Sequence, residues 1–198
     1  LNENYAMPGL TPGTEEQIIK GMYLCKPGAE GDKRVQLLGS GTILRESLEA
    51  QKLLATDWGV QADVWSCPSF NELTRDGQDA ERWNLLHPLE APRVPFVAQQ
   101  LGQRSGPVVA STDYMKNYAE QIRAFIPAGR TYKVLGTDGF GRSDFRSKLR
   151  EHFEVNRHYI AVAALKALAE EGQLPLAKVA EAIQKYGIQT EKNNPLYA

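Results

Sequence analysis

The chain has 198 residues, and its 23 Lys and Arg against 24 Asp and Glu give a net charge of −1. Its 42% hydrophobic and 24% charged residues are typical of a globular domain and exclude a disordered chain. A nearly neutral chain has no general attraction for nucleic acid, and the longest apolar run, residues 159–165, is far shorter than the ~20 residues of a membrane span. We therefore expect no nucleic acid and no membrane among the partners.

The first half of the chain predicts a short helix, then two strands that are each followed by a helical segment. The short helix begins at the capping-box pattern 14–17 and carries Ile18, Ile19 and Met22 on one side. The elements that follow are strand 35–38, helix 44–58, strand 62–66 and a partly helical segment 74–86. Gly59 is the expected end of the second helix.

The second half continues the alternation and ends in helices. The elements expected there are strand 107–110, helix 115–126, strand 132–135 and helices that begin near Ser143, Asn156 and Pro175. Ser143 and Asn156 are the expected caps, and Phe145, Leu149 and Phe153 are expected to point inward. Short apolar strands alternating with helices predict a three-layer α/β fold with a mostly parallel sheet.

Residues 75–106 are predicted to be irregular, because Pro88, Pro92 and Pro95 interrupt the pattern. Long connections inside compact domains are usually functional or interface segments. The segment is also too apolar for a free linker, with Trp83 among its large side chains. We therefore expect it to pack against the domain or against a partner subunit.

A first glycine turn, Gly39-Ser40-Gly41-Thr42, follows a predicted strand and precedes a helix. Its backbone N–H groups could hold an anion. The dinucleotide fingerprint, however, needs a third glycine where Leu44 stands, and the acidic residue it requires would be Asp63, at the beginning of a strand. A tight strand-to-helix turn is the simpler interpretation.

A second glycine-rich run, 136–142, follows the last predicted strand, at the end of the sheet where α/β folds place ligands. Its candidate residues for a ligand or a subunit contact are Asp138, Gly139, Phe140, Gly141 and Arg142. The simpler interpretation is a sharp turn before a capped helix.

The sequence shows no catalytic or metal-binding pattern. Cys25 and Cys67 do not form a C-x-x-C pair, and G-x-S-x-G, P-loop and H-E-x-x-H motifs are missing. The candidate acid–base residues have no catalytic spacing; they are Ser111, Asp113, His87 and His152. We therefore expect no catalytic, cofactor-binding or metal residues, and two reduced thiols in a cytoplasmic protein.

Several longer runs along the chain carry a family resemblance. They are 35–40 (VQLLGS), 76–84 (DGQDAERWN), 87–90 (HPLE), 110–116 (ASTDYMK), 134–144 (VLGTDGFGRSD), 152–155 (HFEV) and Asn194-Pro195. Together these runs resemble the C-terminal region of the homodimeric bacterial pyruvate dehydrogenase family. The resemblance extends from about residue 2 to residue 198. It implies a transketolase-like C-terminal domain, a three-layer α/β/α unit with a five-stranded mixed sheet and one antiparallel strand. The fifth strand would lie near residues 23–25.

The resemblance also implies an activity for a longer parent enzyme. That enzyme decarboxylates pyruvate with thiamine diphosphate and Mg²⁺ and reductively acetylates the lipoyl group of an acetyltransferase component. The family's signature for these cofactors, Gly-Asp-Gly followed by paired Asn, is missing: Thr137 precedes Asp138, and Asn193-Asn194 lies far along the chain. No catalytic or cofactor residue is therefore transferred, and we expect this domain alone to be inactive and to bind neither cofactor.

Leu1 without an initiating Met favours a fragment, so residues 1–198 are expected to form one C-terminal domain. Its parts would be an N-terminal segment 1–30 with the first helix and an α/β core 31–198. The expected partners are the preceding domains, a second copy of the enzyme and, as a further candidate, the acetyltransferase component. The runs 75–95 and 136–142 would form inter-domain or inter-subunit surface. The alternative is a stand-alone nucleotide- or anion-binding α/β module that uses the 39–42 turn.

Overall fold

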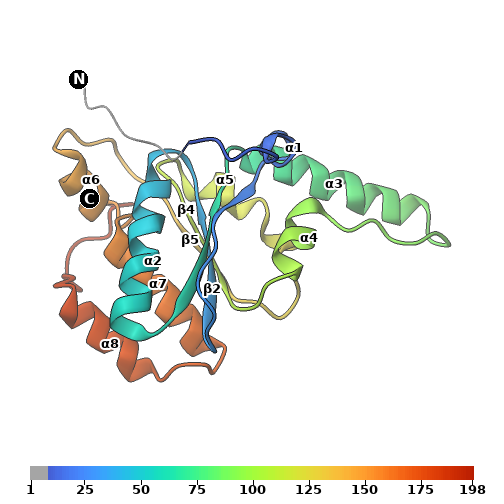
Figure 1. Ribbon diagram of the computed structural model, residues 1–198. Coiled ribbons are helices and arrows are strands. Elements are labelled where there is room, and N and C mark those ends of the chain that lie inside the picture. The colour runs from blue at the N-terminus through green and yellow to red at the C-terminus, as the bar shows by residue number, and fades with distance from the viewer. Residues whose placement is uncertain (1–8) are drawn as a thin grey trace.

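The computed structural model describes residues 9–198, which form a five-stranded mixed sheet with helices on both faces (Figure 1). The strands are β1 (Tyr23–Lys26), β2 (Arg34–Gly39), β3 (Gln61–Ser66), β4 (Val108–Ser111) and β5 (Tyr132–Leu135). Their order is β1-β3-β2-β4-β5; β1 runs antiparallel to β3, and the other pairs are parallel. The predicted fold class is confirmed, including the fifth strand.

Each face of the sheet builds its own apolar core, because successive strand residues point to opposite faces. Leu37 joins the core under α2 (Leu44–Trp58) and α7 (Arg157–Glu170), against which α8 (Leu176–Lys185) packs. Leu38 joins the core under α3 (Phe70–Leu86), α4 (Phe96–Gly102) and α5 (Lys116–Glu120). The remaining elements are α1 (Glu15–Ile19), α6 (Arg146–His152) and the 3₁₀ helices η1 (Gly41–Ile43) and η2 (Arg123–Phe125).

The carboxyl edge of the sheet contains a topological switch point between β2 and β4. The chain leaves β2 toward β3 on one side, whereas β4 pairs on the other side of β2, with Gly39 opposite Ser111. Such edges are where open α/β sheets bind ligands. The segments 39–42, 112–115 and 136–142 all follow strand ends there.

In the N-terminal part, the structure confirms the predicted end of α2 and contradicts the predicted N-cap of α1. Gly59 ends α2 in the left-handed conformation at φ 63°, as expected. The capping box is wrong, because the Thr14 hydroxyl donates to the Thr11 carbonyl and not to the helix. Met22 is fully buried, whereas Ile19 is 75% exposed. Residues 1–8, and the part of the resemblance that falls on them, lie outside the described residues.

The prediction of an irregular segment 75–106 is wrong, whereas the helical part expected within 74–86 is present. Helix α3 continues unbroken to Leu86, and α4 begins at Phe96. Only the stretch between these two helices is a loop, and it contains Pro88, Pro92 and Pro95. The prolines therefore bound the helices from outside and do not disrupt the whole segment.

The predicted helix 115–126 is also wrong, because the chain forms the short α5 and then the 3₁₀ helix η2. Ala119, Ile122 and Phe125 are buried as expected. They are spaced by three, which fits the period of a 3₁₀ helix as well as one side of an α-helix. Pro127 then disfavours a helical conformation at the residue before it.

The last helices follow the prediction in part. Asn156 caps α7, its side-chain oxygen accepting from the N–H groups of His158 and Tyr159. Ser143 does not cap α6, whose N-cap position is Phe145 without a side-chain bond. Phe145 is 80% exposed and does not point inward, because α6 begins two residues later than predicted and Phe145 is its N-cap.

Candidate functional site

The 39–42 turn is shaped by its glycines and closed by a carboxylate. A Cβ on Gly39 would lie 2.7 Å from the Leu44 Cα, and Gly41 has φ +56°. The Thr42 hydroxyl donates to Asp113 Oδ2 at 3.1 Å, and a Cβ on Gly41 would lie 3.2 Å from Asp113 Oδ1. The buried Ser40 donates its N–H to the Ser111 carbonyl. Because a carboxylate repels an anion at this distance, the turn is a structural strand-to-helix connection.

The second glycine run, which we call the rim loop (residues 136–142), is held by hydrogen bonds at its N-terminal end. The Thr137 N–H donates to the Tyr114 carbonyl at 2.8 Å, and its hydroxyl donates to the Asp113 carbonyl at 2.7 Å. Asp138 Oδ2 accepts from the Lys116 N–H at 3.2 Å. Asp138 is therefore used to hold the loop against the segment that follows β4.

The far half of the rim loop is exposed. Gly139 has φ +112°, and a Cβ there would overlap the Pro195 carbonyl, so the C-terminal tail packs directly on the loop. Phe140 is 76% exposed, and Gly141 and Arg142 are exposed beside it. The candidate residues of this run therefore divide into a structural half and a half that presents an aromatic ring and a cation to the surroundings.

A cavity of about 470 Å³ lies between the rim loop, η1 and α6. Its polar wall includes Thr42, Asp113 and Arg142, and its apolar floor includes Leu149 and Phe153. Sequence reasoning missed two further cations of the wall, Arg146 and Arg150. Nothing local could have revealed them, since two arginines one turn apart on a short helix look like a solvated face.

Behind this cavity, the buried Glu46 joins α2 to α6 and α7. Its Oε2 accepts from the Arg157 N–H and Nε, both at 2.9 Å, and its Oε1 accepts from Arg150 Nη1 at 3.0 Å. Burial raises the pKa of Glu46, but the bonds and charges of Arg157 and Arg150 outweigh burial and lower it. The carboxylate stays charged, and its bonds serve the fold.

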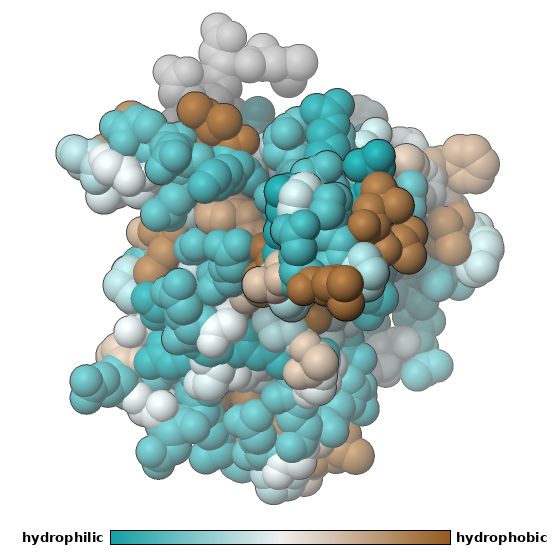
Figure 2. Space-filling view, turned by 90° about the vertical axis from the view of Figure 1, so that its right-hand side faces the viewer, coloured by the Kyte–Doolittle hydropathy of each residue, from teal (hydrophilic) through white to brown (hydrophobic). Residues whose placement is uncertain are grey.

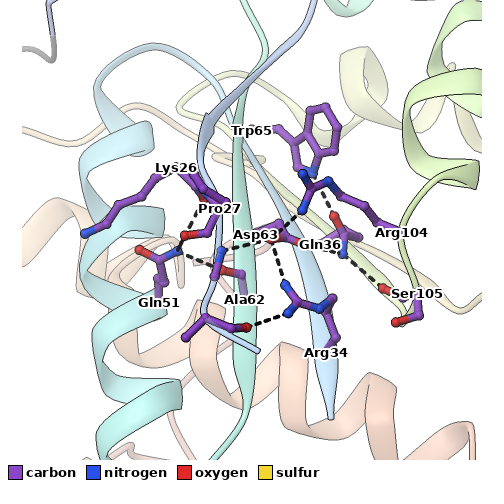
Figure 3. A network of polar contacts seen from close by, with 12 residues as sticks. Lys26, Pro27, Arg34, Gln36, Gln51, Ala62, Asp63, Trp65, Arg104 and Ser105 are labelled. Atoms are coloured by element: carbon purple, nitrogen blue, oxygen red, sulfur yellow. Dashed lines mark hydrogen bonds and ion pairs between the residues drawn. The ribbon is translucent and has the colours of Figure 1, made fainter. Parts of the chain in front are cut away.

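A second buried carboxylate, Asp63 in β3, is saturated by the protein (Figure 3). Its Oδ1 accepts from Gly28 N, Arg34 Nη1 and Arg104 Nη1 at 2.8–3.0 Å. Its Oδ2 accepts from the Gln36 amide at 2.9 Å. Burial raises the pKa of Asp63, but these bonds outweigh it and lower the pKa. With every donor supplied by the chain itself, Asp63 has no capacity for the ribose of a dinucleotide.

The candidate Trp83 lies far from the carboxyl edge, near the end of α3. Its ring stacks on His87 at 3.5 Å between centroids and at an interplanar angle of 11°, and the Arg93 guanidinium lies 3.5 Å from its centroid. The structure thus separates the sequence-predicted residues into two surfaces. One is the rim loop; the other, which we call the arm, comprises residues 81–95.

The candidate acid–base residues do not form a catalytic pair. Ser111 is buried against the Ser47 hydroxyl at 3.0 Å, and the His87 ring contacts the Trp83 carbonyl. Within residues 9–198, no group of three or more His, Cys, Asp or Glu side chains could hold a metal ion. Cys25 and Cys67 are free, and burial raises the pKa of the Cys67 thiol.

The residues present do not fit thiamine diphosphate with Mg²⁺. Asp138, in the glycine-rich turn after β5, accepts from the Lys116 N–H, and in the cavity beside it the Glu154 carboxylate pairs with Lys192 at 3.2 Å. A magnesium site needs several free oxygen ligands around one point, whereas both carboxylates here are already bonded to groups of the chain. Separately, no helix between residues 9 and 198 has the length and apolar character to cross a bilayer.

Comparisons with known proteins agree with this fold. Residues 21–156 match the family model of the transketolase-like TK C-terminal domain. The chain resembles pyruvate dehydrogenase E1 components: it is 61% identical to that of Pseudomonas aeruginosa over 99% of its length, and 57% identical to that of Escherichia coli K12 over 100%. It covers only 22% of each relative, so it spans about a fifth of their length.

Solved structures give the same fold at low identity. A Pichia stipitis transketolase in complex with sedoheptulose-7-phosphate is 17% identical, with a TM-score of 0.53 over 85% of this chain and 21% of that chain. A split-gene transketolase, an inactive β4 tetramer, is also 17% identical, with a TM-score of 0.51 over 76% of this chain and 43% of that chain. By sequence and by fold, the chain belongs to the family of transketolase-like C-terminal domains.

Proposed function

We propose that this chain is the C-terminal domain of a pyruvate dehydrogenase E1 component. The longer protein would oxidatively decarboxylate pyruvate and reductively acetylate the lipoyl group of its acetyltransferase partner, in the cytoplasm. The observation that carries the proposal is the identity of 57–61% to such E1 components along nearly the whole chain. The alternative, an anion-binding module at the 39–42 turn, is not supported, because Asp113 stands beside that turn.

The domain would contribute assembly and not chemistry. The buried carboxylates Glu46 and Asp63 accept hydrogen bonds from arginine and amide groups of the domain itself, so neither is free to act on a substrate. Thiamine diphosphate, when bound, supplies the electron sink for decarboxylation, and its site would lie in the remainder of the longer protein. The work of this domain is then to hold neighbouring parts of that protein in place.

The rim loop and its surroundings are the proposed contact with the preceding domains. Phe140 is 76% exposed, and Tyr114 and Met115, both more than half exposed, extend the apolar surface along the carboxyl edge. This edge of the sheet therefore exposes aromatic rings and Arg142, the residue types that dominate interface energies.

Assays of two proteins test this proposal. The longer protein, supplied with thiamine diphosphate and Mg²⁺, should release CO₂ from pyruvate and acetylate a lipoyl domain, whereas residues 1–198 alone should do neither. A longer protein without pyruvate decarboxylation would contradict the assigned reaction. Turnover by residues 1–198 alone would contradict the assembly role.

A variant pair tests the rim. Phe140→Ser in the longer protein should lower its thermal stability or its rate, because a ring buried in an interface would be lost. Leu176→Ser is the matched control, since Leu176 is 62% exposed at the start of α8, at the opposite edge of the sheet from the rim. Equal behaviour of the two variants would remove the rim from the interface.

A further inference from the structure

The last residues of the chain, 190–198, which we call the clamp, run from α6 to the rim loop without joining either apolar core. In Figure 1 the C-terminus lies beside α6. None of the residues in the clamp is buried, and Leu196 and Tyr197 are exposed by 45 and 82%. Because the clamp buries so little apolar surface, the hydrophobic effect contributes little to its position, and polar contacts have to hold it.

A lysine joins the clamp to the end of α6. Lys192 Nζ donates to the carbonyl oxygens of Glu151 and His152 at 3.0 and 2.8 Å, and it pairs with the Glu154 carboxylate at 3.2 Å. The last carbonyls of a helix have no partner within the helix, and the negative end of the helix dipole favours a cation there. The Lys192 side chain is only 21% exposed, so salt screens these contacts little. The clamp is therefore fixed at residue 192.

The backbone at the end of α6 is strained in favour of this contact. Glu154 has φ 61°, in the left-handed region where a helix usually ends with glycine. The N–H groups of Glu154 and Val155 donate to the carbonyls of Glu151 and Arg150, so the bonds that close the helix hold this conformation. A strained residue kept by its surroundings indicates a functional constraint. Here the constraint is the carboxylate, which glycine could not supply to Lys192.

The clamp meets the rim loop a few residues further on. Gly139 has φ +112°, and a Cβ there would overlap the Pro195 carbonyl. Asn194 Oδ1 accepts from the Leu196 N–H at 2.9 Å, which closes a turn around that carbonyl. Three residues separate Lys192 from Pro195, at most ~10 Å of chain. The contact at α6 therefore determines where the clamp presses on the loop.

The space between these two contacts is not filled. A cavity of about 380 Å³ lies there, and its walls include Lys116, Asp138, Glu154 and Lys192. A packed core would lock loop and clamp together along their length, whereas a cavity leaves both room to shift. The contact of Gly139 with Pro195 therefore carries the coupling between them.

We infer that the clamp sets the conformation in which the rim loop presents Phe140 and Arg142, and that clamp and loop loosen together. Gly139 directly precedes Phe140, so a displacement at Gly139 redirects the exposed ring. Because such coupling is reciprocal, a body that displaces the clamp changes the rim, and a body seated on the rim orders the clamp. These contacts lie within this chain, so they do not depend on the reaction that the longer protein catalyses.

Hydrogen–deuterium exchange in the longer protein tests the coupling from the side of the loop. Gly139→Ala places a Cβ against the Pro195 carbonyl, so the N–H of Leu196 should exchange about tenfold faster as the clamp is displaced. Gly141→Ala is the matched control, since Gly141 lies in the same loop, has no left-handed backbone, and a Cβ there meets nothing within 4 Å. Equal exchange of the clamp in the two variants would overturn the inference.

Lys192→Met tests the coupling from the side of the clamp. Loss of hydrogen bonds from a charged group should speed exchange about tenfold at the Thr137 N–H, which donates to the Tyr114 carbonyl in the rim loop. Lys185→Met is the control, because Lys185 also pairs with a carboxylate, Asp57 at 3.1 Å, but at the end of α8. An unchanged Thr137 rate in Lys192→Met, or an equal rise in Lys185→Met, would overturn the inference.

The arm supplies an internal reference for all four variants, because it projects on the side of the molecule opposite to α6 (Figure 1). Figure 2 looks at the arm end-on and shows hydrophobic side chains gathered there within a mostly hydrophilic surface. Its aliphatic side chains Leu85, Leu86 and Leu89 are exposed by 78, 55 and 99%. Exchange of the Arg93 N–H, which donates to Asn84 Oδ1, should be the same in every variant. A rise there that matches the rise at the clamp or the loop would indicate a general loss of stability and would overturn the assigned coupling.

Discussion

The sheet and the arm use polar side chains in opposite ways. In the sheet, Asp63 is fully buried, and its carboxylate is surrounded by four donor residues from three segments of the domain. In the arm, the bonds of Asn84 and the stack on Trp83 hold a segment that buries no residue. Polar contacts in the sheet therefore stabilise the domain, whereas those in the arm fix a shape that is useful only to a neighbour. Unfolding free energies of single variants in the two regions test this contrast.

The largest loss of stability is expected from Asp63→Ala. The change leaves Arg34 and Arg104 without their carboxylate while both are largely buried, with exposures of 16% and 30%. Breaking such a pair costs about 3 kcal/mol of unfolding free energy, the low end for buried pairs because both arginines reach solvent. Urea unfolding of the 198-residue chain measures it. Asp79→Ala is the control, since Asp79 is 72% exposed in its pair with Arg93.

A smaller loss is expected from Glu46→Gln. The amide keeps the shape of the side chain but removes the charge that Arg157 and Arg150 neutralise, at a cost of about 2 kcal/mol for hydrogen bonds to a charged group. The Glu49→Gln variant should change little, because Glu49 is 36% exposed and lies 3.7 Å from Arg157. Equal urea midpoints for the two variants would contradict the assigned role of Glu46.

The cost of Glu46→Gln should also depend on pH. Because the pKa of Glu46 is lower in the folded chain, the folded state binds fewer protons in acid than the unfolded state. Its stabilisation is therefore complete above the unfolded pKa of about 4.3 and is lost as pH falls through the folded value. The difference in unfolding free energy between wild type and variant should be largest at neutral pH and should shrink in strong acid. A constant difference would refute this origin.

The sequence predicted what depends on local patterns. Strands β2 to β5 were found because apolar runs follow from burial on both faces. The prediction of one helix over residues 115–126 was wrong because the spacing by three of Ala119, Ile122 and Phe125 also fits a 3₁₀ helix. The prediction of an irregular segment 75–106 was wrong because the prolines lie only in the loop between α3 and α4. They do not interrupt either of these helices.

Contacts between distant residues could not be predicted in this way. Glu46 and Arg157 are 111 residues apart, and Asp63 and Arg104 are 41 residues apart. No periodicity links such pairs, and a charged residue within a strand or helix looks like a solvated position until the fold brings its partner. For the candidate site, the glycine runs follow the strand ends at the carboxyl edge as predicted. Only the structure separates the exposed Phe140 and Arg142 from Asp138, which bonds to the Lys116 N–H, and from Gly139, which packs on Pro195.

The smallest effect on stability is expected from Trp83→Ala, which tests the arm. The stack of the half-exposed Arg93 on the partly buried Trp83 ring is worth about 1 kcal/mol or less, so the urea midpoint should barely move. The shape of the arm should loosen, however, and the backbone N–H of Arg93, which donates to Asn84, should exchange faster with deuterium. The control is Trp58→Ala, since Trp58 donates to the Tyr186 hydroxyl on the body of the domain. Trp58→Ala should lower the urea midpoint more than Trp83→Ala does and should leave deuterium exchange in residues 84–94 unchanged. A larger loss of stability from Trp83→Ala than from Trp58→Ala would show that the domain needs the arm in order to fold.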